Sequence, residues 1–238
     1  MNLVIDSGNT RIKAAVFSED ILKEKKTFSD EIELKSFLSH HTYQNAIVSS
    51  VSVDGDKILN AIKAEKKILL NNKLPVPFQN KYSSPETLGV DRIAAVCGAM
   101  DLFPSQNCLV IDAGTCITFE FIDENKNYWG GAISPGIKMR FEAMHTFTKR
   151  LPLVQAEGEL KLIGNSTENC MRSGVLNGVL SEVEGIINQY EKMYSNLKIV
   201  LCGGDALFFE NNLKHTIFAA PDLVLSGLNR ILSHNAAF

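Results

Sequence analysis

An Asp-x-Gly sequence follows a strongly apolar run at two places in the chain. Residues 3–8 read LVIDSG and residues 109–114 read LVIDAG, so five of the six positions are identical. Glycines after a buried strand let several backbone N–H groups point to one place, which creates a site for an anion such as a polyphosphate. Carboxylates beside phosphates require a cation, and a hydrated divalent ion suits them. Asp6 and Asp112 are therefore candidate cation-binding residues beside a phosphate site.

A third apolar run, residues 201–206 (LCGGDA), ends in two glycines and extends the same pattern. The chain contains no Gly-x-x-x-x-Gly-Lys-Ser/Thr and no Gly-x-Gly-x-x-Gly sequence, which excludes the P-loop and the dinucleotide-binding fingerprint as the source of the site. The alternative is that each aspartate only accepts hydrogen bonds from its own turn. The duplication favours the phosphate site over that alternative.

Composition restricts the class of partner. The chain has 238 residues, of which 45% are hydrophobic, and its formal net charge of −3 offers no basic field for a nucleic-acid backbone. Its five cysteines show no Cys-x-x-Cys pairing, which favours reduced thiols. The apolar start is interrupted at Asp6, and no apolar run approaches the length of about 20 residues that spans a bilayer. We expect a cytoplasmic protein with a small-molecule partner, without a membrane or nucleic-acid partner.

The elements that position these residues alternate between strands and helices, which predicts an α/β fold. We expect two duplicated halves, residues 1–104 and 105–238, with the ligand in the groove between them. The first half is expected to contain strands at 3–6, 11–17, 45–51 and 68–70, a polar segment after 17, and helices at 30–40, 55–67 and 90–103. The second half is expected to contain the repeated hairpin, a turn over 127–136, helices from 137 and from 166 or 167, a strand over 197–202 and a closing helix from 222.

Asp91 and Arg92 lie at the expected start of the helix over 90–103. An aspartate there is often only an N-cap. A cation in the first turn is disfavoured by the helix dipole by about 0.3 to 1 kcal/mol unless an anion is near. Arg92 therefore favours a bound carboxylate or phosphate. Lys13, on the second strand of the first hairpin, has a flexible ammonium that can reach back to phosphates, or it is an exposed strand charge.

Several motifs in order along the whole chain resemble one family. They are DSGNTRIK, YSSPETLGVDR, IDAGT, GGAISPG, RLP and NSTENCMRSG. Paired Asp-x-Gly hairpins resemble the actin, hexokinase and heat-shock chaperone ATPase superfamily, and the ordered set is similar to type III pantothenate kinase. The resemblance implies two actin-like (ribonuclease H-like) halves with an interdomain cleft, and phosphorylation of pantothenate by ATP in the first step of coenzyme A biosynthesis.

The resemblance also implies residue roles. Asp91 would be the catalytic base, and Asp112 would bind a monovalent cation, K⁺ or NH₄⁺. Asp6 would hold Mg²⁺ through water. The ATP site would include Asp6, Ser7, Gly8, Asn9, Thr10, Arg11, Ile12, Lys13 and Thr115. The pantothenate site would include Tyr82, Gly89, Val90, Asp91, Arg92 and Thr167. The chain departs from the family at Ser166, where Asn is usual.

Family members are dimers, so a homodimer is expected. In the helix from 137, Phe141, Met144 and Phe147 form an apolar stripe that suits an interface or a core. Two other functions stay open at this stage. One is phosphorylation of a sugar or acetate on the same fold, and the other is a non-catalytic accessory or regulatory role. The presence of Asp6, Asp91, Arg92 and Asp112 together argues against the second.

Overall fold

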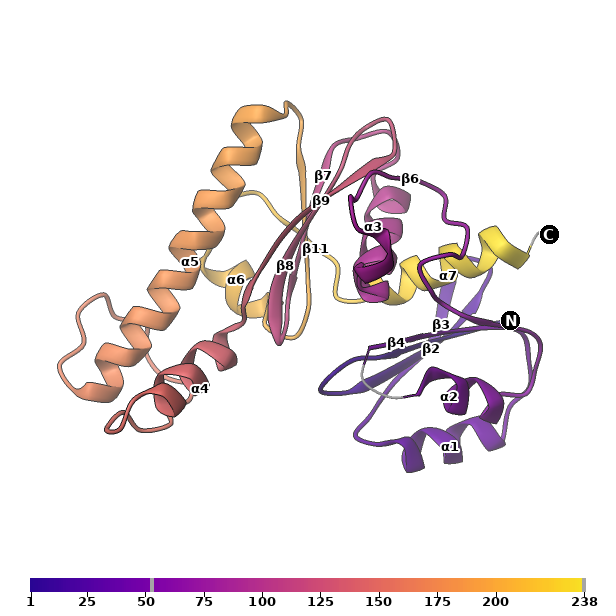
Figure 1. The fold of residues 1–238 in the computed structure, drawn as a ribbon, viewed down its shortest axis with the longest axis horizontal. Coiled ribbons are helices and arrows are strands. Elements are labelled where there is room, and N and C mark those ends of the chain that lie inside the picture. The colour runs from indigo at the N-terminus through magenta and orange to yellow at the C-terminus, as the bar shows by residue number, and fades with distance from the viewer. Residues whose placement is uncertain (52–53, 237–238) are drawn as a thin grey trace. The chain divides into compact units, whose positions relative to one another are not determined.

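The computed structural model describes residues 1–51 and 54–236. Within these residues the chain forms two sheets and their covering helices (Figure 1). The first sheet has the strand order β3-β2-β1-β4-β5, with bounds β1 Asn2–Ser7, β2 Ile12–Ser18, β3 Ile21–Phe28, β4 Tyr43–Ser50 and β5 Ala64–Leu69. The second has the order β11-β10-β7-β8-β9-β6, with bounds β6 Gln79–Asn80, β7 Cys108–Ala113, β8 Cys116–Ile122, β9 Asn127–Pro135, β10 Lys198–Cys202 and β11 Phe218–Ala219.

The helices follow the strands in an order that also repeats. Their bounds are α1 Glu31–Ser39, α2 Gly55–Ala61, α3 Val90–Leu102, α4 Ile137–Phe147, α5 Thr167–Met193, α6 Ala206–Asn212 and α7 Leu223–Ala236, with a 3₁₀ turn at Pro85–Thr87. In the first sheet β1 lies between antiparallel β2 and parallel β4, and in the second β7 lies between β8 and parallel β10. The order β3-β2-β1-β4-β5 is thus matched by β9-β8-β7-β10-β11. This correspondence confirms the duplicated α/β fold expected from the two apolar runs.

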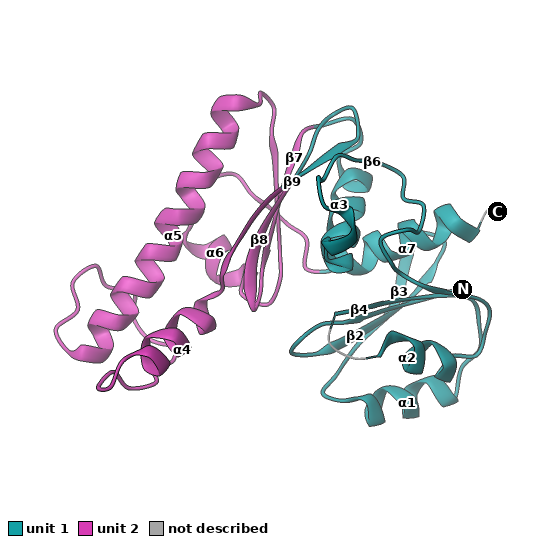
Figure 2. Ribbon diagram, viewed as in Figure 1, with its two compact units in different colours: residues 1–106, 121–130, 222–238 teal, residues 107–120, 131–221 magenta. Residues whose placement is uncertain are grey.

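Two compact units divide the chain by contact (Figure 2). Unit 1 consists of residues 1–106, 121–130 and 222–238, and unit 2 of residues 107–120 and 131–221. The bounds of the two units follow from contacts between residues. The halves 1–104 and 105–238 were expected from the repeated sequence, and we keep this division as a proposal. No helix among the described residues is long and apolar enough to cross a membrane.

The core of unit 1 explains the opening run of the sequence. Leu3, Val4 and Ile5 of β1 are all fully buried, because helices cover both faces of the first sheet. Leu3 and Ile5 belong to the core with Leu34 of α1 and Ile58 of α2, whereas α7 packs against β1 and β4. Each fully buried side chain of this kind contributes about 1.5–3 kcal/mol. A strand buried on both faces has no polar alternation, which is why its sequence is apolar throughout.

Two glycines allow α3 and α7 to approach closely within unit 1. A Cβ atom on Gly98 would overlap the backbone oxygen of Leu223, and one on Gly227 would overlap that of Ala94. The backbones of the two helices therefore touch at these points, which larger side chains would prevent. The contact joins the C-terminal helix of the chain to the helix that begins at Val90.

Unit 2 has its own core, built mainly by α5 and the second sheet. Val179 and Val183 of α5 are fully buried with Ile111 of β7 and Leu201 of β10. Phe141 of α4 is also buried in this core. The long helix α5 therefore packs against the strands that lead to the second Asp-x-Gly turn and to Gly203, namely β7, which ends at Ala113, and β10, which ends at Cys202.

Three expected elements were wrong. The polar segment after residue 17 is strand β3, an edge strand that pairs with β2 and exposes most of its side chains, so it needs no apolar alternation. The turn expected over 127–136 is largely strand β9. The helix expected over 55–67 ends at Ala61, and residues 64–69 form β5, parallel to β4.

Candidate active site

The first Asp-x-Gly turn connects β1 to β2 in unit 1. Asp6 and Lys13 are directly opposite in the antiparallel pair, so their side chains lie on the same face of the sheet. The backbone N–H of Gly8 donates to the carbonyl of Arg11 at 3.2 Å, which closes the turn. A cavity of about 290 Å³ is lined by residues 7–12 and by Ser29, Asp30 and Glu31 at the start of α1. Of the residues expected to contact ATP in this half, those from Ser7 to Ile12 line this cavity, whereas Asp6 and Lys13 are not among its lining residues.

Tyr82 and Arg92, which are ten positions apart in the sequence, are brought together in unit 1. The Arg92 guanidinium carbon lies 5.4 Å from the centre of the Tyr82 ring, a cation–π distance. Arg92 is only 7% exposed, so its charge is largely removed from water and favours an anion. The other ring partner of Tyr82 is Tyr128, stacked at 6.2 Å between centres with an interplanar angle of 23°.

Pairing of β6 with β9 sets the place of Tyr82. Asn80 is opposite Tyr128, and the Lys81 N–H donates to the Tyr128 carbonyl at 2.8 Å. The Tyr82 N–H then donates to Asn80 Oδ1 at 2.9 Å, which turns the chain. Gly130 has φ +90°, and a Cβ built on it would lie 2.7 Å from a Tyr82 ring carbon. A glycine at position 130 is therefore required to leave room for the ring.

Asp91 lies in the first turn of α3 but is not its N-cap. The cap position is Gly89, and the helix begins at Val90, so the N-cap interpretation of Asp91 was wrong. Asp91 Oδ1 accepts a hydrogen bond from the Arg92 backbone N–H at 2.9 Å. A Cβ on Gly89 would lie 2.5 Å from the same Oδ1. Gly89 thus leaves room for the Asp91 carboxylate, which explains why a glycine stands two positions before Asp91 in the motif Gly89-Val90-Asp91-Arg92.

The second Asp-x-Gly turn lies in unit 2 and is bordered by two glycines from elsewhere in the chain. A Cβ on Gly203, which has φ +96°, would lie 2.5 Å from Asp112 Oδ1. The Gly136 N–H donates to the Thr115 carbonyl at 3.1 Å, and a Cβ there would lie 2.5 Å from the same oxygen. Within unit 2, the repeated turn therefore contacts two other segments. One is the Gly203-Gly204 pair after β10, and the other is the Ser134-Pro135-Gly136 sequence at the end of β9.

The oxygen atoms at these turns fit a hard cation. Asp112 supplies a carboxylate next to the glycine cradle, and Asp6 supplies a carboxylate beside the first turn. Carboxylate oxygens are the ligands that Mg²⁺ prefers, and Mg²⁺ usually keeps several waters and takes one or two carboxylates together with substrate phosphates. Single carboxylates beside glycine turns match that requirement.

Thr167 begins α5, and Ser166 caps the helix. Ser166 Oγ accepts a hydrogen bond from the Asn169 N–H at 3.3 Å. Serine and asparagine both serve well as N-caps, so Ser166 can fill the capping role of an asparagine at this position. The structure places Thr167 in the first, exposed turn of α5.

Sequence reasoning missed three residues near these groups. Tyr128 and Gly130 were assigned to a turn, although two glycines in a possible strand are a signal of close approach. Asp205 follows the Gly-Gly strand end, and burial raises the pKa of its carboxyl. It borders a cavity of about 180 Å³ with Phe141 and Glu142 of α4.

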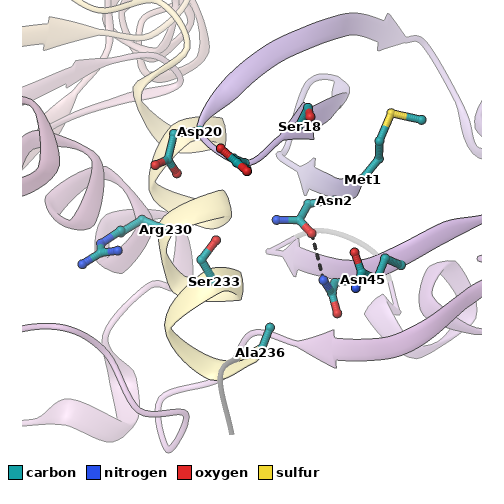
Figure 3. Close-up of a pocket in the computed structure, with 10 residues that line it drawn as sticks. Met1, Asn2, Ser18, Asp20, Asn45, Arg230, Ser233 and Ala236 are labelled. Carbon is teal, nitrogen blue, oxygen red and sulfur yellow. Dashed lines mark hydrogen bonds between the residues drawn. The ribbon is translucent and has the colours of Figure 1, made fainter.

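A separate cavity of about 640 Å³ lies at the other ends of the strands in unit 1 (Figure 3). It is lined by Asn2 at the start of β1, whereas the Gly8 turn follows the end of that strand. Asn45 donates to Asn2 at 2.9 Å, and Asn2 donates to Asn229 of α7 at 3.0 Å. Asn229 is 2% exposed and donates to the Glu19 carbonyl, so this network ties α7 to the sheet.

Known proteins resemble this chain in sequence and in fold. The sequence model of the type III pantothenate kinase family matches residues 2–189. A type III pantothenate kinase of Christiangramia forsetii is 44% identical over 241 residues, covering 99% of each chain.

Two solved structures share the fold. One is described as a conserved putative Baf family transcriptional activator from Campylobacter jejuni, with a TM-score of 0.65 and 22% identity over 99% of this chain and 100% of that one. The other is component A of the (R)-2-hydroxyglutaryl-CoA dehydratase of Acidaminococcus fermentans, with a TM-score of 0.58 and 16% identity over 100% of this chain and 99% of that one. Together with the repeated strand order, the family match shows two duplicated actin-like halves, and the chain belongs to the type III pantothenate kinase family.

Proposed function

We propose that the chain transfers the γ-phosphoryl group of ATP to the primary hydroxyl of pantothenate, giving 4′-phosphopantothenate and ADP. This is the first step of coenzyme A biosynthesis. Family membership supports the reaction class, and the constellation of Tyr82, Asp91 and Arg92 in unit 1 carries the assignment of the acceptor site. A carboxylate base next to a buried cation suits an acceptor that has a hydroxyl at one end and a carboxylate at the other.

Asp91 is the proposed base. Its Oδ1 is already fixed by the Arg92 N–H, which orients the carboxylate. In the reaction the hydroxyl oxygen of pantothenate attacks the γ-phosphorus, the bond to the β-phosphate oxygen breaks, and Asp91 takes the hydroxyl proton. A positioned base contributes about 10²- to 10⁴-fold, and positioning with charge neutralisation supplies the remainder.

Arg92 and Tyr82 are the proposed pantothenate-binding groups, with Gly89, Val90 and Thr167. The guanidinium of Arg92 can bind the pantothenate carboxylate in a bidentate manner. Because Arg92 is held over the Tyr82 ring, the position of the ring also sets the position of the cation. The two side chains are therefore expected to act together on pantothenate affinity.

The nucleotide-binding roles are proposed separately for the glycine turn of each unit. Asp6 to Lys13 would line the phosphates from the first turn, with Lys13 on the same face as Asp6, and Thr115 would contact the nucleotide from the second. Asp6 would hold Mg²⁺ through water, and Asp112 would hold K⁺ or NH₄⁺. These ions supply positive charge that offsets the phosphates.

We further propose a cytoplasmic homodimer. The five cysteines are free thiols, as a reducing compartment favours. Within the expected interface stripe, Phe141 is buried in the core of unit 2, whereas Phe147 is 86% exposed. Phe147 is thus the member of the stripe that is open to a partner. Light scattering at micromolar concentration tests the dimer, and a stable monomer contradicts it.

One assay tests the reaction. Purified protein is incubated with ATP, Mg²⁺ and K⁺ and with pantothenate, sugars or acetate, and the products are identified by mass. A pantothenate-specific phosphate product is expected. Product from a sugar or acetate alone selects a different kinase, and no product with any acceptor selects a non-catalytic accessory role.

A further inference from the structure

One arginine on α4 holds the segment at the end of β9. Arg140 Nε donates to the Pro135 carbonyl at 2.9 Å, and Nη2 donates to Ser134 Oγ at 2.9 Å. Nη2 also donates to Glu182 Oε2 of α5 at 2.7 Å. Charge-assisted hydrogen bonds of this length are among the stronger polar contacts in proteins. Both side chains are mostly shielded, with 21% and 30% exposed, so water weakens the pair less than it weakens a surface pair.

The held segment contacts the second Asp-x-Gly turn through Gly136. Gly136 follows Pro135, donates its N–H to the Thr115 carbonyl and lies too close to that turn to carry a Cβ. The Gly136 carbonyl in turn accepts the Arg140 N–H at 3.1 Å. A displacement of Pro135 and Gly136 must therefore move Thr115 or break its hydrogen bond.

Glu182 connects this arrangement to a rigid element. It lies in the middle of the 27-residue helix α5, next to the fully buried Val183. Arg140 thus links α5, which packs in the core of unit 2, to the Ser134–Gly136 segment. Gly136 has no side chain that could hold this segment in place.

We propose that Arg140 and Glu182 are positioning residues for nucleotide binding. They fix the Ser134–Gly136 segment and, through Gly136, the turn from Asp112 to Thr115. This inference rests on the proposed function, because that function assigns the nucleotide and a monovalent cation to this turn. Neither residue is assigned contact with ATP or pantothenate.

The variants Arg140→Lys and Glu182→Gln test the proposal. A lysine keeps the charge but is a point donor, so it cannot serve three acceptors as a planar guanidinium does. Glu182→Gln removes the charge of the acceptor with little change of shape. Because displacements of about 1 Å in an active site cost up to about 10²-fold, we expect each variant to raise the KM for ATP about tenfold. The KM for pantothenate is expected to change less than about threefold.

Glu184→Gln is the matched control. Glu184 lies on the same helix, and its substitution makes the same change of charge without touching the Arg140 contacts. It is expected to leave both KM values unchanged. Ser134→Ala removes one acceptor and keeps the ion pair, so it gives a smaller effect in the same direction and remains informative if the charged variants fail to fold.

Affinity for a non-hydrolysable ATP analogue is measured without pantothenate for every variant, together with the melting temperature. This binding measurement tests the positioning role even if the wild type does not phosphorylate pantothenate, which would overturn only the proposed function. A selective loss of nucleotide affinity supports the proposal. Wild-type affinity in Arg140→Lys and Glu182→Gln, or equal losses for ATP and pantothenate, overturns it.

Discussion

The Gly130→Ala substitution tests the arrangement around Tyr82 in unit 1. The added methyl group would lie 2.7 Å from one ring carbon of Tyr82 and 2.9 Å from another, whereas ordinary contacts begin at 3.4 Å. The ring must therefore move by about 0.7 Å, the difference between the first distance and an ordinary contact. The positive φ of 90° adds about 1–3 kcal/mol of backbone strain to the folded state.

Movement of the ring also moves Arg92, which lies over it. Since a misplacement of about 1 Å costs up to about 10²-fold, kcat/KM for pantothenate is expected to fall between about 10- and 10²-fold. Affinity for an ATP analogue should be unchanged, because the first glycine turn is formed by β1 and β2. Steady-state kinetics with each substrate varied, together with thermal melts, measure these effects.

Gly178→Ala provides a matched control. Apart from its chain neighbours and the nearby backbone of α5, no atom of the described residues lies within 4 Å of a Cβ at that position, and alanine is the better helix former. It should retain wild-type kinetics with equal or slightly higher stability. In Tyr82→Ala, adding Gly130→Ala should have little further effect on kinetics, because no ring is left to displace. A folded Gly130→Ala protein with the wild-type KM for pantothenate would refute the reasoning.

Three other predictions concern the base, the cation and acid stability. Asp91→Asn should retain ATP-analogue affinity and lower turnover by at least about 10²-fold, and wild-type turnover would remove Asp91 from the mechanism. Replacing K⁺ by Na⁺ at constant ionic strength should lower the rate, and equal rates would argue against a monovalent site at Asp112. Burial acts to raise the pKa of Asp123, but hydrogen bonds from Trp129, Asn127 and Asn125 outweigh it and hold the pKa below its ordinary value of 3.8. Since the folded pKa is below the unfolded one, these bonds stabilise the hairpin above pH 3.8 and are lost at lower pH, so Trp129 fluorescence should change there in the wild type and not in Asp123→Asn.

Elements with a strong local pattern could be predicted from the sequence. The apolar run Leu3 to Ile5 is a strand buried on both faces, and α5 begins where its hydroxyl cap predicts. Strand β3 could not be predicted in this way, because an edge strand with both faces exposed carries no alternation. Strand β9 was missed because Gly130 and Gly131 are typical of turns, and the reason for them lies in Tyr82 and Phe119, which are distant in sequence.

The candidate site shows the same limit. Asp91, Arg92 and the two Asp-x-Gly turns are local patterns, and their residue types already indicate phosphate chemistry. The stacking of Tyr82 on Tyr128 depends on the register of β6 with β9, which no local pattern specifies. The contact of Gly136 with Thr115 likewise depends on tertiary packing. Residue roles that depend on such pairings become visible only in three dimensions.

The close contact of α3 with α7 has a consequence for biosynthesis of the chain. The ribosome makes α3 more than 120 residues before it makes Gly227 and the rest of α7. Until α7 emerges, the face of the first sheet that α7 covers stays open, so the unit that holds Asp91 cannot finish folding before residues 223–236 have emerged. Premature termination before residue 223 should therefore leave even the N-terminal half of the enzyme as an aggregation-prone product rather than a stable fragment.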